Sequence, residues 1–341
     1  MILLINCSSF ISGGHQSQGK SSLFPRHIYI PQDINLKDAA YHKSSGRYNV
    51  EWWYFDTICY NGYSIAFSFG IISKDSRGIW ILTLNIYNNA ELEFSKRKEV
   101  PIKDVYASEE FPFINVSRNN FMRLDRELYN STGEWVYNIS IEIDNQSAQL
   151  QFQGKSKGYM GEILRGWYGP VLPKAMVNGT LFLNGETIYV NGSGYHEHAW
   201  GITLPVWEWG WYWGKIESGS FSIQWAKMMQ TQWRKQAQAA VLSPNQSEYI
   251  NINPENIKIK VSNYIYDHWR MIPTKFILNI TDPENSIFVN VTLETINVHH
   301  EGKTLMHYYR YHVKVNGQIT YGSTLETING RVQIMEFMRF R

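Results

Sequence analysis

Four of the six Asn-Gly dipeptides in the chain, each lying between apolar runs, restrict its fold more than any other feature. They occur at Asn61-Gly62, Asn184-Gly185, Asn316-Gly317 and Asn329-Gly330. Asn-Gly is typical of two-residue β-hairpin turns, because both central residues of such a turn take positive φ angles. The sequence therefore predicts a hairpin at each of these positions.

The segments around these dipeptides have the composition of β-strands. β-branched and aromatic residues are frequent there and mostly follow a period of two. Amphipathic helical periodicity is scarce, and residues 227–238 are the best candidate for a helix. We therefore expect an all-β chain in which strands make up at least about 80% of the ordered secondary structure. The predicted strands include residues 78–87, 134–143, 187–190, 287–293 and 305–315.

The length of 341 residues predicts roughly two domains. Residues 1–45 are polar and show no periodicity, so we expect a tail or lead-in there. Pro205 interrupts the strand pattern and is our preferred boundary. The prediction is therefore one antiparallel β-barrel over residues 46–204 and a second over residues 205–341.

The composition excludes several classes of protein. Charged residues make up 18% of the chain, aromatic residues make up 15%, and the formal net charge is only +2. Aromatic content this high excludes a disordered chain, and a near-neutral balance argues against a nucleic-acid partner. The only cysteines, Cys7 and Cys59, exclude a disulfide framework and a cysteine-based zinc site. No glycine-rich phosphate loop or other cofactor motif occurs, so we expect no cofactor.

The cellular location has two interpretations. Residues 1–7 form a short apolar stub, and the chain holds ten Asn-x-Ser/Thr sequons, more than chance predicts. These features favour an exported or membrane-associated protein with peripheral membrane contact. The alternative is a cytoplasmic protein with an ordinary N-terminus, since no apolar run reaches the length of a transmembrane helix. The sequons lie at Asn6, Asn115, Asn130, Asn138, Asn145, Asn178, Asn191, Asn245, Asn279 and Asn290.

The first candidate site motif is Glu-Trp-Trp-Tyr-Phe-Asp at residues 51–56. Strand alternation places Glu51 and Trp53 on one face, and Trp52 and Tyr54 on the other. Two interpretations remain open. The segment is either a buried barrel strand with an acid near each end, or a strand of which one face lines an aromatic cavity.

The second motif is Gly-Ser-Gly-Tyr-His-Glu-His-Ala-Trp-Gly at residues 192–201. His196, His198 and Trp200 share one face of the predicted strand, and Glu197 points to the other face. The residues are therefore either a candidate acid–base group or core histidines that are hydrogen-bonded inside a barrel.

A metal site is a further interpretation of the two histidines. A His-x-His pair on a strand can chelate a metal, but a catalytic metal requires at least three protein ligands. The acid that cupins place four or five residues after the second histidine is replaced by Ile202 and Thr203. No spacing points to another histidine as the third ligand. We therefore expect no metal.

The third motif is a row of tryptophans. Trp207, Trp209, Trp211 and Trp213 recur at every second residue, so they form a continuous indole wall on one strand face. The wall either faces another domain or lines a large apolar pocket. The low charge content favours a pocket, and barrels commonly hold apolar ligands at their mouths.

Residues 51–56 and 194–201 resemble the signature segments of the AttH/CrtC-type lipocalin-like family. That family includes carotenoid 1,2-hydratases (hydroxyneurosporene synthases) and bacterial AttH proteins, and it is more distantly related to fungal lipocalin-like Diels-Alderases. The resemblance covers about residues 45–340. It implies two consecutive lipocalin-like barrels with a hydrophobic site in or between them.

The resemblance also implies functional residues. The hydratases have an Asp/Glu-His-x-Trp-Gly segment whose histidine and tryptophan are functional, and Glu197, His198 and Trp200 match it. Their downstream Tyr-x-Asp pair has no counterpart at residues 222–227. The resemblance therefore indicates the fold more directly than it indicates hydration of a carotenoid.

These features together predict a protein that acts on a hydrophobic isoprenoid or polyene-like molecule by acid-assisted hydration or cyclisation. His198 or His196, with Glu197 or Glu51, would hold the proton, because burial raises the pKa of a carboxyl group toward neutrality. Two alternatives are a lipocalin-like carrier without catalysis and a pericyclase. The predicted ligand-binding side chains are Trp53, Tyr54, Trp200, Trp207, Trp209, Trp211 and Trp213.

Overall fold

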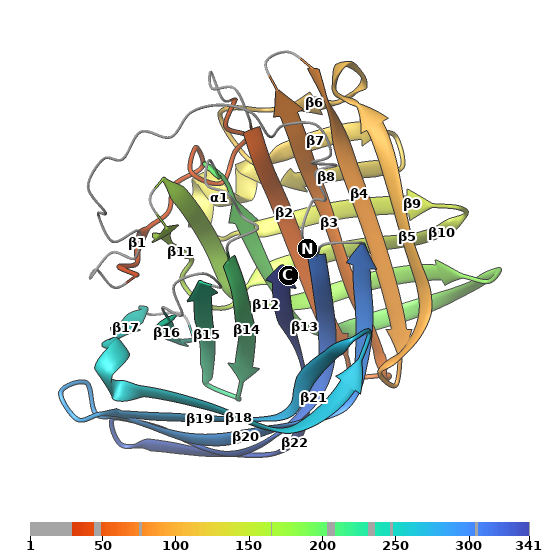
Figure 1. Cartoon of the computed structure of the whole chain (residues 1–341). Helices are drawn as coiled ribbons and strands as arrows, with labels where there is room; N and C mark the ends of the chain where they lie inside the picture. Colours follow the sequence, from red (N-terminus) through yellow and green to blue (C-terminus); the bar gives the residue numbers. More distant parts are fainter. Residues whose placement is uncertain are drawn as a thin grey trace, which may run out of the picture.

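The computed structural model confirms an all-β protein. Of the residues it describes, 76% lie in strands and 5% in helices. The strands form two curled antiparallel sheets, which lie against each other and have the form of two lipocalin-like half-barrels (Figure 1). The described residues are 29–43, 49–74, 77–164, 166–202, 209–230, 236–245, 248–303 and 306–340.

The first sheet has thirteen strands. Its main path runs β5-β4-β3-β2-β13-β12-β10-β9-β8-β7-β6, and β11 pairs with both β12 and β1. The neighbours β2 and β13 carry the two sequence motifs, with Trp53 opposite His198. The strands are β1 (Gln32–Asp33), β2 (Asn49–Cys59), β3 (Tyr63–Lys74), β4 (Arg77–Asn88), β5 (Glu91–Pro101), β6 (Tyr106–Ala107), β7 (Phe113–Ser117), β8 (Asn120–Leu124), β9 (Val136–Ile143), β10 (Gln146–Gly154), β11 (Tyr159–Leu164), β12 (Trp167–Leu183) and β13 (Glu186–Ala199).

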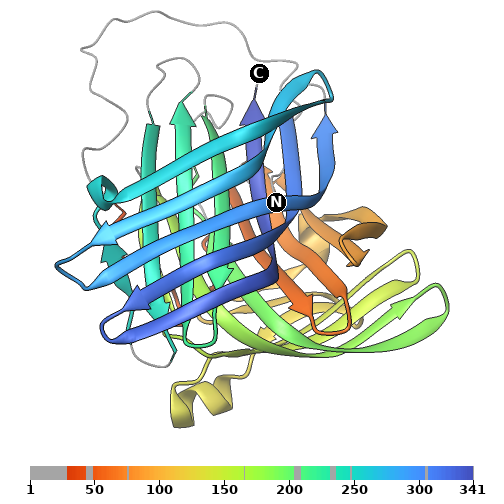
Figure 2. The same cartoon turned by 90° about the horizontal axis from the view of Figure 1, so that it is seen from below.

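The second sheet has nine strands in the order β17-β16-β15-β14-β22-β21-β20-β19-β18. Figure 2 shows how its long strands bend as they cross the molecule. The strands are β14 (Trp209–Glu217), β15 (Phe221–Gln230), β16 (Gln236–Pro244), β17 (Ile250–Ile252), β18 (Ile257–Asp267), β19 (Arg270–Asp282), β20 (Ile287–Lys303), β21 (Met306–Tyr321) and β22 (Thr324–Phe340). Pro205, the predicted domain boundary, lies outside the described residues.

The described helices are short: η1 (Ile102–Asp104), α1 (Arg126–Thr132) and η3 (Pro254–Asn256). None of the helices in the described segments is long and apolar enough to cross a membrane. The prediction of a helix at residues 227–238 is wrong where the structure describes it, because β15 runs to Gln230 and β16 starts at Gln236. Alternate residues on these strands face the other sheet, so tertiary packing outweighs a weak helical pattern.

The Asn-Gly dipeptides have two different roles. Asn61-Gly62 and Asn184-Gly185 form the predicted hairpin turns. The turns predicted at Asn316-Gly317 and Asn329-Gly330 are wrong, because these pairs lie inside β21 and β22 and face each other across a register shift. Gly317 and Gly330 both have positive φ angles, with values of 142° and 68°. A β-bulge requires the same backbone freedom as a tight turn, so the dipeptide alone does not distinguish them.

Part of the predicted lead-in packs against the first sheet. Ala39 and Ala40 are buried, and the Ala39 carbonyl accepts a hydrogen bond from Trp53 Nε1 at 3.0 Å. The Tyr41 ring lies 5.9 Å from that of Trp80. Residues 29–43 therefore form a strap across this sheet, and we refer to them as the strap.

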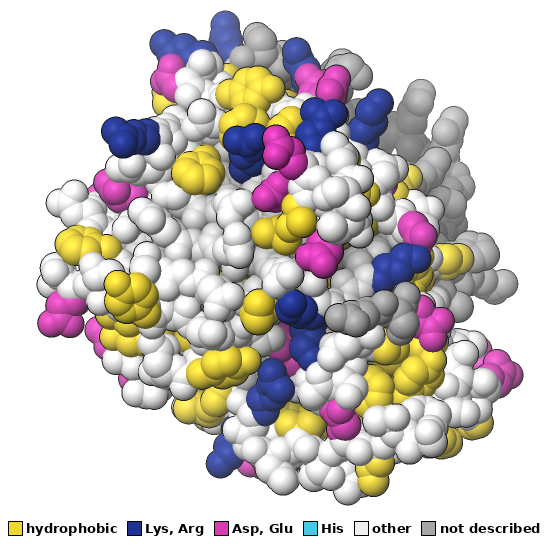
Figure 3. Space-filling view, turned by 180° about the vertical axis from the view of Figure 1, so that it is seen from behind, with side chains coloured by type: hydrophobic (Ala, Val, Ile, Leu, Met, Phe, Trp, Pro, Cys, Tyr) yellow, Lys and Arg dark blue, Asp and Glu magenta, His cyan; other side chains and the backbone are white. Residues whose placement is uncertain are grey.

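Each sheet encloses a hydrophobic core on its concave side, and a third cluster lies between the two sheets. The outer surface shown in Figure 3 carries positively and negatively charged side chains interspersed with one another. The inter-sheet cluster includes Trp52 and Tyr54 from β2, Tyr195 from β13, and Trp209 and Trp211 from β14. The outward faces of β2 and β13 are therefore covered by the second sheet and are not exposed to solvent.

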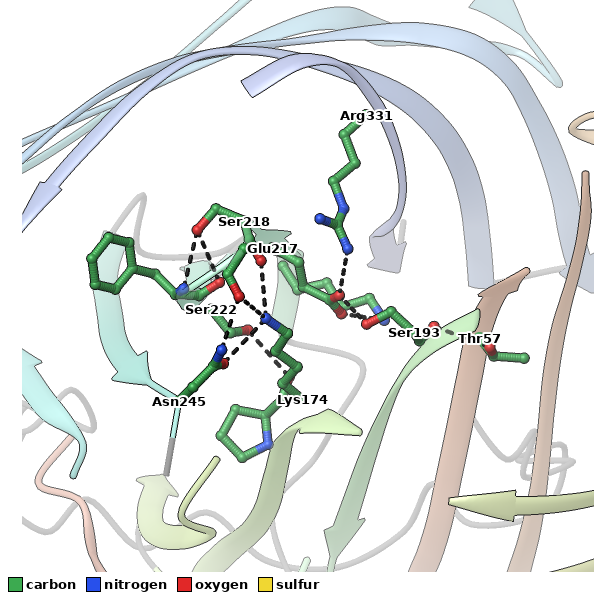
Figure 4. A network of polar contacts seen from close by, with 12 residues as sticks. Thr57, Lys174, Ser193, Glu217, Ser218, Ser222, Asn245 and Arg331 are labelled. Carbon is green, nitrogen blue, oxygen red and sulfur yellow. Dashed lines mark hydrogen bonds and ion pairs between the residues drawn. The ribbon is translucent and has the colours of Figure 1, made fainter. Parts of the chain in front are cut away.

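Buried charged groups also connect the sheets. Lys215 of β14 donates to Asp56 of β2, and both side chains are fully buried. Glu217 lies 3.6 Å from the Lys215 ammonium group and accepts a hydrogen bond from Ser193 of β13. Figure 4 shows Glu217 between Ser193 and Arg331, whose Nη2 lies 3.3 Å from Glu217 Oε2. This ionic network joins four strands across the boundary between the sheets.

We expect Lys215→Met to destabilise the protein by about 3–5 kcal/mol, because the variant leaves the Asp56 and Glu217 carboxyl groups buried without their cation. Urea unfolding of both proteins measures the difference. Lys275→Met is the control, since Lys275 pairs with Glu294 at an exposed position and its loss should change the unfolding midpoint little. Equal midpoint shifts for the two variants would contradict a role for this network in holding the sheets together.

Candidate active site

A cavity of about 350 Å³ lies between the two sheets. Strands β11, β12 and β13 line it on one side, β14, β15 and β16 line it on the other, and Tyr29 of the strap closes part of it. A volume near the lower end of the usual range for ligand sites indicates a compact ligand. The aromatic lining consists of Tyr29, Trp52, Tyr159, Trp167, Tyr195, Trp211, Trp213 and Trp225.

Glu197 of β13 is a carboxyl group in this aromatic wall. Tyr195 donates a hydrogen bond to Glu197 Oε2 at 2.8 Å, and Trp52 Nε1 lies 3.4 Å from Oε1. Burial raises the pKa of Glu197 above its usual value, and the nearby Glu336 carboxylate raises it further. The site therefore holds a carboxyl group that keeps its proton to higher pH than an exposed glutamate does and can release it to a bound molecule.

Glu336 of β22 is a second carboxyl group that lines the cavity. Its Oε1 lies 3.6 Å from Nη2 of the buried Arg310. Burial alone would raise the pKa of Glu336. The pKa is nevertheless lowered, in part because the positive charge of Arg310 lies nearby. The two acids consequently differ in protonation, with Glu197 protonated more readily than Glu336. Such a separation of pKa values is typical of acid–base pairs in active sites.

The opposite face of β13 has different surroundings. His198 borders the cavity, but its ring stacks on Trp53 at 4.3 Å and its Nε2 lies 2.7 Å from Glu51 Oε1. Burial lowers the pKa of His198 well below its usual value, so the ring is neutral at pH 7. His196 stacks on Phe55 at 3.9 Å, and burial lowers its pKa to about 3. Neither ring is therefore charged at neutral pH.

Three solved structures have a similar fold across most of their length. An AttH protein (NE1406) from Nitrosomonas europaea has a TM-score of 0.63 at 11% identity, with 94% of this chain and 100% of that chain covered. Kievitone hydratase from Nectria haematococca has a TM-score of 0.53 at 12% identity, covering 85% and 88%. CghA with Sch210972 has a TM-score of 0.53 at 10% identity, covering 86% and 89%. No protein-family model and no curated protein matches the sequence.

This chain has the AttH-type lipocalin-like fold. The resemblance inferred from residues 51–56 and 194–201 is thereby confirmed for the fold. Because the AttH-type fold combines two curled sheets, it allows a binding site between them as well as within either one. In this protein, the described cavity with aromatic walls and buried acids is of the first kind.

The predicted ligand-binding tryptophans fall into three groups. Trp211 and Trp213 line the cavity, and Trp209 is buried in the cluster between the sheets. Trp207 lies outside the described residues. Trp53 does not line this cavity, and its fully buried ring is part of the core of the first sheet.

Two further predicted ligand-binding side chains also lie off the cavity wall. Trp200 stacks on His42 at 3.8 Å and on Tyr168 at 4.6 Å. Tyr54 is buried between the sheets and donates to Asp56 at 3.2 Å. The face shared by Trp200 and His198 is therefore packed largely against protein side chains.

Several cavity residues were missed by the sequence analysis. Tyr29, Tyr159, Trp167 and Gln224 line the cavity from separate segments, as does Glu336. Tyr159 donates to Gln224 Oε1 at 3.0 Å, which joins the two sheets at the cavity wall. The only signal in the sequence was the general excess of aromatic residues, which does not show which of them meet.

The pKa of Glu197 predicts a pH dependence of stability. Because this pKa is raised in the folded protein, the stabilising contribution of the proton is present below the unfolded value of 4.5. The contribution is lost as the pH rises through the folded value. Glu197→Gln has no such proton, so the stability of the wild type relative to this variant should fall as the pH rises above 4.5 and through the raised pKa of the folded protein.

Urea unfolding at a series of pH values measures this difference. Glu186→Gln, an exposed position at the start of the same strand, is the control and should follow the wild-type profile. Parallel profiles for the wild type and Glu197→Gln would mean that Glu197 titrates alike in the folded and unfolded states.

Proposed function

We propose that this protein catalyses acid-assisted hydration or cyclisation of a hydrophobic alkene, with Glu197 as the proton donor. The observation that carries the proposal is a carboxyl group of raised pKa in the wall of an aromatic cavity. An unactivated double bond needs a strong, well-placed acid, and such an acid is stable at neutral pH only where burial favours its protonated form.

The cavity supports a compact substrate. Its walls are mainly aromatic, and its polar groups are few, including Glu197, Glu336 and Gln224. A volume of about 350 Å³ favours a short isoprenoid or a prenylated aromatic compound over a full-length carotenoid. The similarity to kievitone hydratase in fold agrees with this class of reaction.

The two acids suit the two halves of a hydration. Glu197 would transfer its proton to one alkene carbon, where the π electrons form the new C–H bond and leave a cation on the other carbon. Water would then add through its oxygen and lose a proton to the Glu336 carboxylate. The substrate gains one water molecule, and return of the proton from Glu336 to Glu197 resets the site. In a cyclisation, a hydroxyl group of the substrate takes the place of water.

The indole rings would stabilise the intermediate. Trp211 and Trp213 of β14 lie across the cavity from β13, and Trp52 lies beside Glu197. The face of an indole attracts a cation, by about 2 kcal/mol or more where water is excluded. The same rings would exclude bulk water from the cavity, so that water meets the cation only at the reacting carbon.

A carrier function is the second candidate. His196 Nδ1 faces the Tyr54 carbonyl at 2.9 Å, and the His198 ring is held by Glu51 and Trp53, so both histidines have structural partners. In that case the cavity would bind a lipid or isoprenoid without changing it. A pericyclase is the third candidate, since it needs only the cavity shape and a hydrogen-bond donor such as protonated Glu197.

We expect Glu197→Gln to lower the rate of water addition by at least about 10²-fold, the usual contribution of a general acid. Binding of the fluorescent polyene parinaric acid should be retained, because glutamine keeps the size of the side chain. Activity is measured on short terpenols, beginning with farnesol, by mass spectrometry in H2O and D2O. Deuterium at the protonated carbon identifies proton transfer as part of the reaction.

Glu186→Gln is the matched control and should retain activity. Equal activity of Glu197→Gln and the wild type would contradict the assignment of the donor. Polyene binding without any chemical change of the panel would favour the carrier.

The His198→Ala variant tests the histidine that matches the family motif. If His198 is the proton donor, the variant should lose activity by about 10²- to 10⁴-fold while its folding stays nearly intact. The observed contacts predict instead a loss of about 1–3 kcal/mol of stability, because Glu51 loses its buried partner, with polyene binding unchanged. Melting temperature and polyene affinity distinguish these outcomes.

A further inference from the structure

Three side chains with metal-ligating atoms meet on the inner face of β2 and β13. They are His42 of the strap, Glu51 of β2 and His198 of β13, and one ligand atom from each lies within 4.8 Å of the others. Glu51 Oε1 lies 2.7 Å from His198 Nε2 and 3.1 Å from His42 Nδ1. Glu51 and His198 are fully buried, whereas the His42 side chain is 27% exposed.

The surroundings of His198 orient its ring as in a metal site. Its stacking on Trp53 at 4.3 Å fixes the ring plane, and its Nε2 lies 2.7 Å from Glu51 Oε1. A neutral imidazole carries one proton, and Nε2 presents a lone pair to Glu51 in the tautomer that is protonated at Nδ1. The ring plane of a histidine that ligates a metal is likewise fixed by its surroundings.

The surroundings of His42 and Glu51 are equally restricted. The His42 ring stacks on Trp200 at 3.8 Å, and its backbone N–H lies 3.0 and 3.2 Å from the two Glu51 oxygens. The carboxyl group therefore faces ring nitrogens from two different segments. A lone pair that faces a carboxylate is repelled unless a proton or a cation lies between them.

We propose that His42 Nδ1, His198 Nε2 and the Glu51 carboxylate bind one divalent transition-metal ion such as Zn²⁺. Two imidazoles with one carboxylate match the three protein ligands of many zinc sites, whereas Ca²⁺ and Mg²⁺ prefer oxygen ligands alone. The half-exposed side of His42 leaves a fourth position for water. A small rotation of the carboxyl group would admit the ion between Glu51 and the two rings.

The ion would fasten the strap to the first sheet. His42 lies near one end of the strap, and Tyr29 near the other end lines the cavity between the sheets. Tyr29 donates to the Gly169 carbonyl at 3.3 Å. A metal at His42 would therefore hold in place a segment that forms part of the cavity wall. The site lies on the opposite face of β13 from Glu197, so it does not rest on the proposed function.

The test uses the full chain, stripped with EDTA and dialysed into metal-free buffer. We expect titration with ZnCl2 to show one equivalent bound and a raised melting temperature. CoCl2 should give visible d–d absorption bands of a low-coordinate nitrogen–oxygen site. His42→Ala should weaken Zn²⁺ binding by more than about 100-fold, since loss of a mere supporting contact already costs about 10- to 100-fold.

Two further variants complete the test. Glu51→Gln should also lose binding; if it fails to fold, the half-exposed His42 still provides the decisive variant. His300→Ala is the control, because it disrupts a surface group of imidazoles in which His300 stacks on His268 and lies 3.2 Å from His307. This control should bind Zn²⁺ as the wild type does.

Three results would overturn the proposal. They are no stoichiometric binding by the wild type, equal binding by His42→Ala, and loss of binding in His300→Ala. The last result would assign the metal to the surface imidazoles.

Discussion

The alternation of side chains along β2 and β13 is the constraint on which the rest of this structure depends. These strands are neighbours, and both of their faces are buried, one by the core of the first sheet and the other by the second sheet. Successive residues therefore enter different environments although they are adjacent in sequence. Glu197 faces the cavity between the sheets, whereas His196 and His198 are packed against Phe55 and Trp53. One strand thus serves two chemically distinct sites.

Packing between the sheets determines what the cavity can do. Aromatic side chains exclude water from Glu197, and burial is the main reason that its pKa is raised. Arg310 supplies a buried positive charge that favours the ionised form of Glu336 on the same wall. The Lys215 network holds the sheets together nearby, with each carboxyl group close to a cation. Two glutamates with different protonation then become available within one apolar enclosure, which neither sheet would provide alone.

Much of the fold could be predicted from local patterns. The strands over residues 78–87 and 134–143 and two of the four hairpin turns follow from period-two composition and from Asn-Gly chemistry. The bulge at Asn329-Gly330 could not be distinguished from a turn, because both need a positive φ angle and only the pairing of β21 with β22 decides between them. The strap was missed for a similar reason, since its few buried residues, such as Ala39, form no periodic pattern.

The sequence by itself determined which side chains share a strand face, because the strand period is two whatever the surroundings. It therefore separated Glu197 from His198 and placed Trp209, Trp211 and Trp213 together. Only the tertiary structure decided which face meets the cavity and which partners come from distant segments. Glu336 and His42 approach β13 from opposite ends of the chain, and no local pattern encodes such contacts. They arise because two curled sheets and a strap bury their apolar faces together, which is a property of the whole chain.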